Sequence, residues 1–165
     1  MRSDPKRKPW KGFATGALGG LAASFAMGQF FALFQTAESS GASQDKEDST
    51  VQAANAVSQS VFHHRLTLEQ KKIAGPAMHY GFGASVASLY GTAAEFAPLV
   101  RLGWGMAFGA AVWLGAHVIV VPALGLSAPI SKSAPRKEAT ELGAHLVYGA
   151  IVEGLRRFVR RYVLR

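Results

Sequence analysis

Four apolar stretches, each about long enough to cross a lipid bilayer, divide the chain into spans and links, at residues 12–35, 74–98, 102–126 and 139–158. A membrane-spanning helix needs about 20 predominantly apolar residues. Only His79, Glu95 and His117 interrupt the first three stretches, whereas the fourth is more polar. The pattern predicts an all-α polytopic membrane protein, in which residues 1–165 form a single membrane domain built as a four-span helical bundle.

The first and fourth stretches each admit another interpretation. A secretory signal has an apolar core of roughly 7 to 15 residues. The first stretch is longer and no convincing small-x-small cleavage site follows Phe34, so we expect an uncleaved span. The fourth stretch carries Glu141, His145 and Glu153 and also fits an amphipathic helix that lies on the membrane surface.

Residues 36–73, between the first two spans, read as a polar linker followed by a short amphipathic helix on the outer side of the membrane. Apolar residues recur there near helical spacing, at Val51, Ala54, Val57 and Val61. Thr67 and Gln70 resemble a capping box, which predicts that a new helix begins just ahead of the second span.

The first span carries a small residue at every fourth position, at Gly12, Gly16, Gly20, Ser24 and Gly28. In water an interior glycine costs a helix about 1 kcal/mol relative to alanine. In a bilayer, small residues let helix backbones approach closely, and such packing drives helix association. We therefore interpret these residues as a helix-packing ridge, within a tight bundle or between copies of the chain.

Charge is concentrated at the two ends of the chain. The formal net charge is +8, and five of the cations lie in residues 1–11 and five more in residues 156–165. Because these basic clusters adjoin apolar runs, they favour the positive-inside arrangement over nucleic-acid binding. With four spans, we expect the bilayer as the main partner, no nucleic acid, and both termini on the cytoplasmic side of a bacterial inner membrane.

Several ionisable residues fall inside the predicted spans. Topology brings His79, His117, His145 and Glu141 into one layer in the outer half of the membrane, because each lies a similar distance from the outer end of its span. Three interpretations are open: neutral histidines that hydrogen-bond between helices, a proton-responsive site, or a metal site with these residues as ligands. No ligand-type spacing singles out the metal site, and without cysteine a thiolate site is excluded.

Glu95 and Glu153 form a second predicted layer near the inner face, close to the basic rim. The rim either neutralises them or they take part in ion conduction. No P-loop, dinucleotide fingerprint or nucleophile elbow is present in the sequence, so we expect neither an enzyme nor a bound cofactor.

Three blocks from residue 74 onward resemble the YagU-like family of small bacterial inner-membrane proteins, whose biochemical function is not established. The blocks are "AGPAMHYGFGASVASLYGTAAE" (74–95), "GAAVWLGAHVIVVPALGLSAP" (109–129) and "ELGAHLVYGAIVEGLRR" (141–157). The motif positions are His79, Tyr90, Glu95, His117, Pro122, Gly125, Glu141, His145, Glu153, Arg156 and Arg157. The resemblance implies an inner-membrane location, a loose association with acid tolerance, and no known substrate.

Two functions follow as hypotheses. The first is a structural or accessory membrane protein that binds copies of itself or a larger membrane complex through its helix ridges. The alternative is a small proton- or ion-linked transport or sensing unit that uses the histidine layer and the inner glutamates. Convergence of His79, His117 and His145 on a shared site would favour the alternative, and separate positions for them would remove its basis.

Overall fold

The computed structural model describes residues 8–35, 48–127 and 130–163, and every regular element in this part of the chain is helical. The all-α prediction is therefore confirmed. The elements, in chain order, are α1 (Pro9–Gln35), α2 (Ser49–Phe62), α3 (Leu68–Phe96), η1 (Pro98–Gly105), α4 (Met106–Val112), η2 (Trp113–Val120), α5 (Val121–Ala123), η3 (Ile130–Lys132) and α6 (Pro135–Tyr162).

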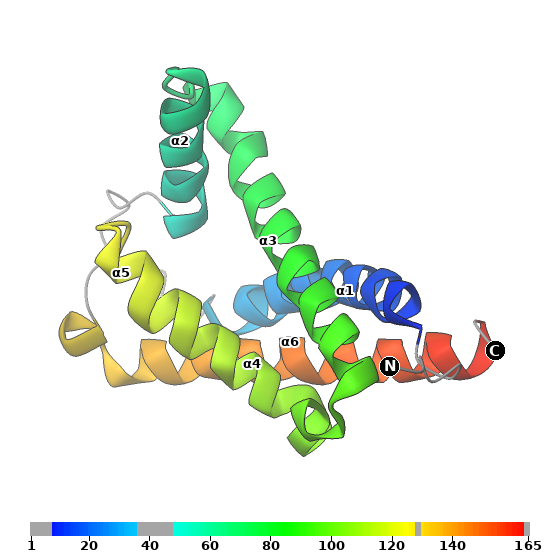
Figure 1. Cartoon of the computed structure of the whole chain (residues 1–165). Helices are drawn as coiled ribbons and strands as arrows, with labels where there is room; N and C mark the ends of the chain where they lie inside the picture. The colour runs from blue at the N-terminus through cyan, green and yellow to red at the C-terminus, as the bar shows by residue number, and fades with distance from the viewer. Residues whose placement is uncertain (1–7, 36–47, 128–129, 164–165) are drawn as a thin grey trace.

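Helices α1 and α3 cross each other (Figure 1), and their backbones are in contact through the predicted ridge, with the two chains running in opposite directions. A Cβ atom added to Gly12 would overlap the carbonyl of Gly91, and one added to Gly16 would overlap the carbonyl of Ala87. Gly20 meets Gly83 in the same way, 2.6 Å from its carbonyl oxygen. Glycine is thus required at these crossings because the other helix occupies the space of a side chain.

The two remaining ridge positions differ from each other. The Ser24 hydroxyl fills the space where a Cβ of Gly83 would lie, so Ser24 also belongs to the α1–α3 contact. At Gly28 a Cβ would meet nothing within 4 Å. Gly28 therefore has no packing partner among the described residues, because the helices have already diverged at that turn.

A second glycine contact joins the end of η1 and α4 to α6, again with the chains in opposite directions. A Cβ on Gly105 would overlap the Gly149 carbonyl, and a Cβ on Gly109 would overlap the His145 carbonyl. On its other side α6 lies along α1, where Gly19 meets Val152 and Gly143 meets Phe30. The four long helical segments therefore alternate in direction and pack through small residues.

Helix α2 packs on the first half of α3 and extends away from the other helices (Figure 1). Asp48 caps the start of α2 by accepting from the Thr50 amide over 3.2 Å, and His63 ends it in the left-handed conformation (φ 52°). The capping box predicted at Thr67 and Gln70 is present and opens α3. The short helix predicted from apolar spacing therefore has its own start and stop signals.

The third apolar stretch is not a regular α-helix. Its start lies in η1, where Leu102, Gly103 and Trp104 leave helical geometry and both Gly103 and Trp104 have positive φ. The elements α4, η2 and α5 then follow one another as a continuous helical segment, the α4–α5 rod. Within this rod η2 is π-helical over Trp113–Val120. A π-helical stretch inserts extra residues into the helix and rotates the side chains that follow it.

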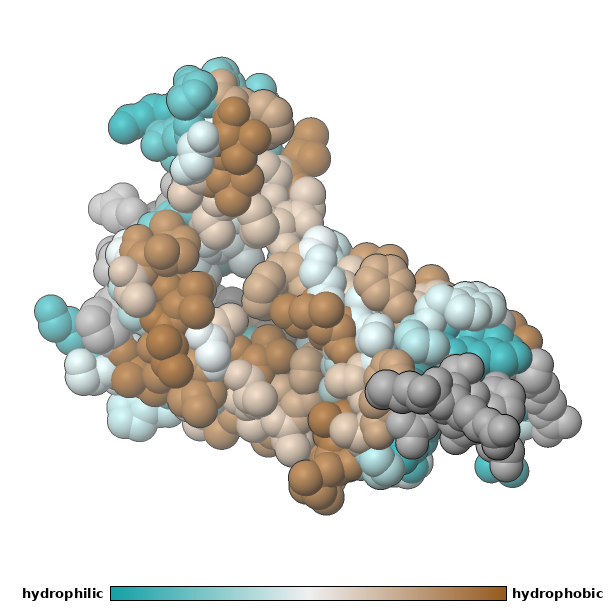
Figure 2. All heavy atoms as spheres, viewed as in Figure 1, coloured by the Kyte–Doolittle hydropathy of each residue, from teal (hydrophilic) through white to brown (hydrophobic). Residues whose placement is uncertain are grey.

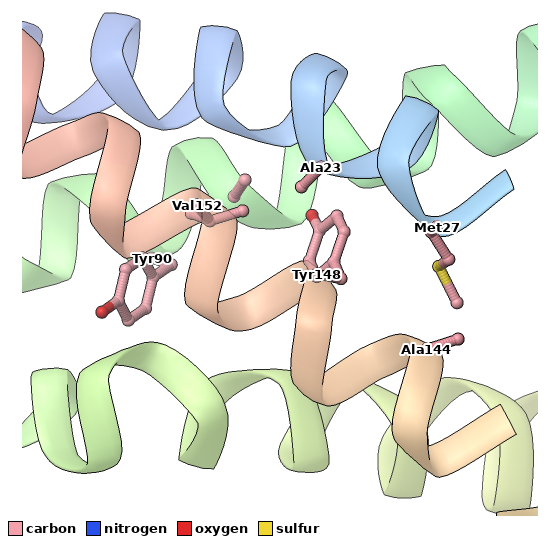
Figure 3. Close-up of a cluster of buried hydrophobic side chains, with 7 residues drawn as sticks. Ala23, Met27, Tyr90, Ala144, Tyr148 and Val152 are labelled. Carbon is pink, nitrogen blue, oxygen red and sulfur yellow. The ribbon is translucent and has the colours of Figure 1, made fainter. Parts of the chain in front are cut away.

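The buried apolar core lies where α1, α3 and α6 meet (Figure 3). Two aromatic residues occupy it, Tyr90 from α3 and Tyr148 from α6, and Phe108 of α4 stacks on Tyr90 with ring centroids 4.3 Å apart. The Tyr148 hydroxyl donates to the carbonyl of Gly83 over 2.5 Å. The small residues around these rings leave the volume that the two tyrosines fill.

Large apolar side chains cover much of the outer surface (Figure 2). Examples from α1 and from the α4–α5 rod are Phe25, Leu33, Leu114, Ile119 and Leu124, each at least half exposed. Two segments, Pro9–Phe34 and Pro98–Ala123, are long and apolar enough to cross a membrane, and only 6% of the apolar window in the second is buried. The core helix of a soluble protein would be mostly buried instead.

Length and apolarity support two spans, not the predicted four. Most of α3 and α6 is formed by residues 74–98 and 139–158, as predicted. These two helices are long enough to cross a membrane but are not apolar enough to be identified as spans by composition. In α3 the apolar side chains are diluted by Gly, Ser, Tyr and His, and α6 carries Glu and Arg along its length.

Candidate functional site

A buried ionic cluster lies between α3 and α6, at the end of the molecule where both helices finish. The Glu153 side chain is fully buried, and one of its oxygens accepts from the Tyr90 hydroxyl over 2.9 Å. Arg156 makes a bidentate contact with the same carboxylate, over 2.7 and 3.0 Å, and Arg157 adds a further bond. Every oxygen of Glu153 is therefore satisfied, as burial of a carboxylate requires.

Glu95 extends this cluster towards α1. Its side chain is 6% exposed and accepts from Arg160 over 2.8 Å, while Arg156 lies 3.7 Å away. Arg156 is itself only 6% exposed and so lies between two buried carboxylates. The structure thus brings the predicted residues Glu95 and Glu153 into one cluster, in which arginines offset both charges.

Tyr90 and Arg160 also belong to this cluster, although the sequence indicated Tyr90 only as a motif position of the resemblance and Arg160 only as one of the C-terminal cations. Tyr90 lies on the buried face of α3, one turn before Ala94 and Glu95. Arg160 follows Arg156 by one turn on α6. The spacing Glu153, Arg156 and Arg157, three and four residues apart, was a sequence signal for ion pairs within one helix.

The three predicted histidines have three different hydrogen-bond partners. His79 Nε2 lies 3.3 Å from the carbonyl oxygen of Ser24, a contact between α3 and α1. His145 Nδ1 donates to the carbonyl of Glu141 over 2.8 Å, within α6. The histidines therefore do not share a hydrogen-bond partner.

His117 pairs with a residue that the sequence analysis did not name. Its Nε2 lies 3.2 Å from Glu138 Oε2, and these two side chains are 23% and 12% exposed. Glu138 precedes the predicted partner Glu141 by three residues on α6 and so lies on a neighbouring part of the same face. The π-helical geometry of η2 sets the rotation of His117 about the rod axis.

The histidine layer exists only as a loose group. The rings of His117 and His145 have centroids 6.4 Å apart, and Trp113 stacks beside His117 at 6.4 Å. Among the residues that the structure describes, no three His, Asp or Glu side chains converge in a way that would hold a metal ion. The metal interpretation of His79, His117, His145 and Glu141 therefore has no geometric support.

An open groove lies elsewhere, between α2 and α3. Phe62, Ala77, Gly81 and Phe82 are among the residues that line it. None of the three predicted histidines borders this groove, and neither Glu95 nor Glu153 does. The groove and the ionisable layers are thus separate features of the fold.

A protein-family model, described as a protein of unknown function (DUF1440), matches residues 44–154, about two thirds of the chain. The chain belongs to the DUF1440 family. The DUF1440 match covers α2 through most of α6 and therefore includes both Tyr90 and Glu153. No curated protein and no solved structure matches this DUF1440 chain.

Proposed function

We propose that this DUF1440 protein is an integral protein of a bacterial inner membrane with four spans and a structural or accessory role. Exposed apolar surface on α1 and on the α4–α5 rod carries this proposal. In Pro98–Ala123 only 6% of the apolar window is buried, and Leu102, Leu114 and Ile119 are each at least half exposed, which would be costly in water and is favourable against lipid.

Internal satisfaction of polar groups supports α3 and α6 as the other two spans. Charged side chains in a membrane are tolerated where they face the bundle and pair with one another. Glu153, Arg156 and Glu95 are buried and paired, and Ser88 donates to the carbonyl of Ala84 in its own helix over 2.8 Å. A helix can therefore cross the bilayer even though its composition is less apolar than that of α1.

Helix directions support the predicted topology. The start of α1, the end of α3 and the end of α6 meet at one end of the molecule, as the contact of Gly12 with Glu95 and the Glu95–Arg160 pair indicate. Lys8, Lys11 and Arg160 lie at the helix ends that meet here, so the positive-inside rule favours the cytoplasmic side for this end. The α2–α3 hairpin and the start of α6 then lie on the outer side.

The histidine contacts favour the structural role over transport. The bonds from His79 to α1 and from His117 to α6 each join two helices, which is what interhelical hydrogen bonding requires. A Cβ at Gly28 or Gly115 would meet nothing within 4 Å, so these two small residues leave space where copies of the chain or other membrane proteins can approach closely.

Alkaline extraction of membranes tests the location. We expect the protein to stay in the pellet after carbonate treatment and to need detergent for solubility. Release into the carbonate supernatant, or a monodisperse protein without detergent, would contradict an integral location.

The alternative, a proton-linked unit, has one observation in its favour: His117 lies in a π-helical stretch beside Glu138 and His145. Proton flux into proteoliposomes with a trapped pH dye separates the two roles. The structural role predicts no flux above that of protein-free vesicles. Flux that His117→Gln lowers, and that the control His63→Gln on the exposed α2 cap does not, would establish the alternative instead.

A further inference from the structure

The groove between α2 and α3 has the size and lining of a site for an apolar ligand. Its volume is about 830 Å³, and ligand pockets in proteins measure about 300 to 1,000 Å³ and are mostly apolar. Val57 and Phe62 line it from α2, and Met78 and Phe82 line it from α3. Phe62 is 73% exposed and Phe82 is 47% exposed, so the described helices leave this apolar surface open.

The charge of the lining indicates what the groove can hold. The described residues that line it include no Asp, Glu, Lys or Arg, and its polar members are Ser58, His64, Gln70 and Ser85. A charged group buried without a partner is costly. The groove is therefore complementary to an uncharged hydrocarbon chain and not to a charged segment.

The two ends of the groove differ in polarity. At the tip of the α2–α3 hairpin, His64 Nε2 lies 3.1 Å from Gln70 Oε1, and the Thr67 amide donates to the same oxygen over 2.8 Å. Both contacts use the oxygen of Gln70, so its NH₂ group is left to donate to a ligand. At the other end, the Ser85 hydroxyl donates to the carbonyl of Gly81 in its own helix over 2.7 Å. The polar end thus offers a donor, and the hydroxyl at the apolar end is already satisfied.

The length of the groove matches one leaflet of a bilayer. From Ala74 to Ser85 the lining of α3 covers about 16 Å at 1.5 Å per residue, and the hydrocarbon core of a bilayer is about 30 Å thick. In the four-span arrangement the span of α3 starts at the outer side near Ala74. Gln70 then lies at the level of the outer headgroups and Ser85 lies near the centre of the bilayer. The polar and apolar ends therefore have the order of a lipid headgroup and its chain.

We propose that this groove binds one acyl chain of an outer-leaflet phospholipid. The inference rests on the proposed membrane location and adds to it a ligand and its site. Gly81 lets the chain approach the backbone of α3, because a Cβ at this position would meet nothing within 4 Å. The Gln70 amide donates to an ester or phosphate oxygen of the same lipid.

Native mass spectrometry of the full chain in detergent tests the ligand. We expect dipalmitoyl phosphatidylcholine to bind more tightly than dioctanoyl phosphatidylcholine, which has the same headgroup, because only the longer chain extends along the whole groove. Dipalmitoyl phosphatidylglycerol should bind as well as dipalmitoyl phosphatidylcholine, because the lining carries no charge to select between the two headgroups.

A matched pair of glycine variants tests the site. Gly81→Leu places a side chain in the groove and should weaken binding of dipalmitoyl phosphatidylcholine by about tenfold or more, because the exclusion of two methylene groups is enough for that loss. Gly28→Leu is the control, since Gly28 is equally open but lies on α1, outside the groove. If Gly81→Leu does not fold, Phe82→Ala removes an exposed part of the lining and should weaken binding in the same direction.

Other outcomes overturn the inference. Equal effects of Gly81→Leu and Gly28→Leu would show that the lipid does not occupy the groove. A clear preference for phosphatidylglycerol would show that charge and not the chain decides binding. Dimers that Gly81→Leu converts to monomers in the same spectra would identify a second copy of the chain as the occupant. Carbonate extraction reports separately on the membrane location, because it does not depend on whether the groove of the extracted protein binds lipid.

Discussion

The Tyr90 hydroxyl of α3 donates to Glu153 of α6 over 2.9 Å, inside the buried end of the bundle. Through Glu153 the tyrosine is also connected to Arg156, and through Arg156 to Glu95. One polar cluster therefore joins two helices that are parallel to each other and distant in sequence. Its stability depends on each charge keeping its partner, because the three buried side chains are at most 6% exposed to solvent.

Removing the charge of Glu153 should destabilise the fold strongly. In Glu153→Gln, Arg156 keeps only Glu95 at 3.7 Å as an ionised partner. Loss of one member of a buried ion pair costs about 3 kcal/mol or more in free energy of unfolding. SDS titration of the detergent-solubilised protein, followed by circular dichroism, measures the change.

Two further variants serve as comparisons for Glu153→Gln. Tyr90→Phe removes one bond to a carboxylate that keeps both arginines, so we expect a loss of about 1.5 kcal/mol. Glu69→Gln breaks the exposed pair with Lys72 on α3, and we expect less than about 1 kcal/mol. Equal effects of Glu153→Gln and Glu69→Gln would contradict the buried cluster.

Bulk added at the α1–α3 crossing should separate the helices. Gly16→Ala inserts a Cβ that overlaps the Ala87 carbonyl, and backbone cannot rotate away as a side chain can. We expect a loss of about 1 to 3 kcal/mol. Gly28→Ala is the matched control on the same helix, because its Cβ meets nothing within 4 Å. Because alanine has the higher helix propensity and nothing opposes its Cβ at position 28, a loss at Gly28 as large as that at Gly16 would contradict the packing role of the ridge.

Two of the positive-φ glycines, one at each end of the rod, separate backbone strain from packing. Gly105 (φ 85°) and Gly125 (φ 71°) both disfavour a side chain, by about 1 kcal/mol. Only Gly105 also faces a backbone, the carbonyl of Gly149, whereas Gly125 faces open space. We therefore expect Gly105→Ala to lower the midpoint of thermal unfolding clearly more than Gly125→Ala, measured by light scattering or dye binding in detergent. Equal shifts would mean that the α4–α6 contact contributes nothing.

The helix content and the glycine contacts could be predicted from the sequence, because small residues four positions apart form a surface on which another helix can approach closely. The rotation of each helix about its axis could not be predicted. Glu138, Glu141 and His145 all lie on one side of α6, and packing decides that Glu138 and not Glu141 meets His117. No particular residue composition marks the π-helical stretch that orients His117, so this stretch could not be predicted without the packing of the neighbouring helices.

The irregular start of the third stretch also lay beyond sequence reasoning. Trp104 adopts φ 57°, which an L side chain disfavours, and its ring is held under Arg157. Sequence reasoning predicted an unbroken span there, since Leu102, Gly103 and Trp104 belong to an apolar run. Contacts with a helix more than 50 residues away decide the local conformation.

Cysteine labelling tests the four-span claim most directly, because the chain contains no cysteine of its own. Four single variants place a thiol at exposed positions along the chain: Ser60→Cys in α2, Leu102→Cys in η1, Ser131→Cys in η3 and Val163→Cys after α6. In bacterial spheroplasts, a membrane-impermeant maleimide should label positions 60 and 131, and should label positions 102 and 163 only after permeabilisation. If only the two most apolar segments crossed the membrane, position 102 would be labelled from outside and position 131 would be protected, which would contradict the four-span bundle.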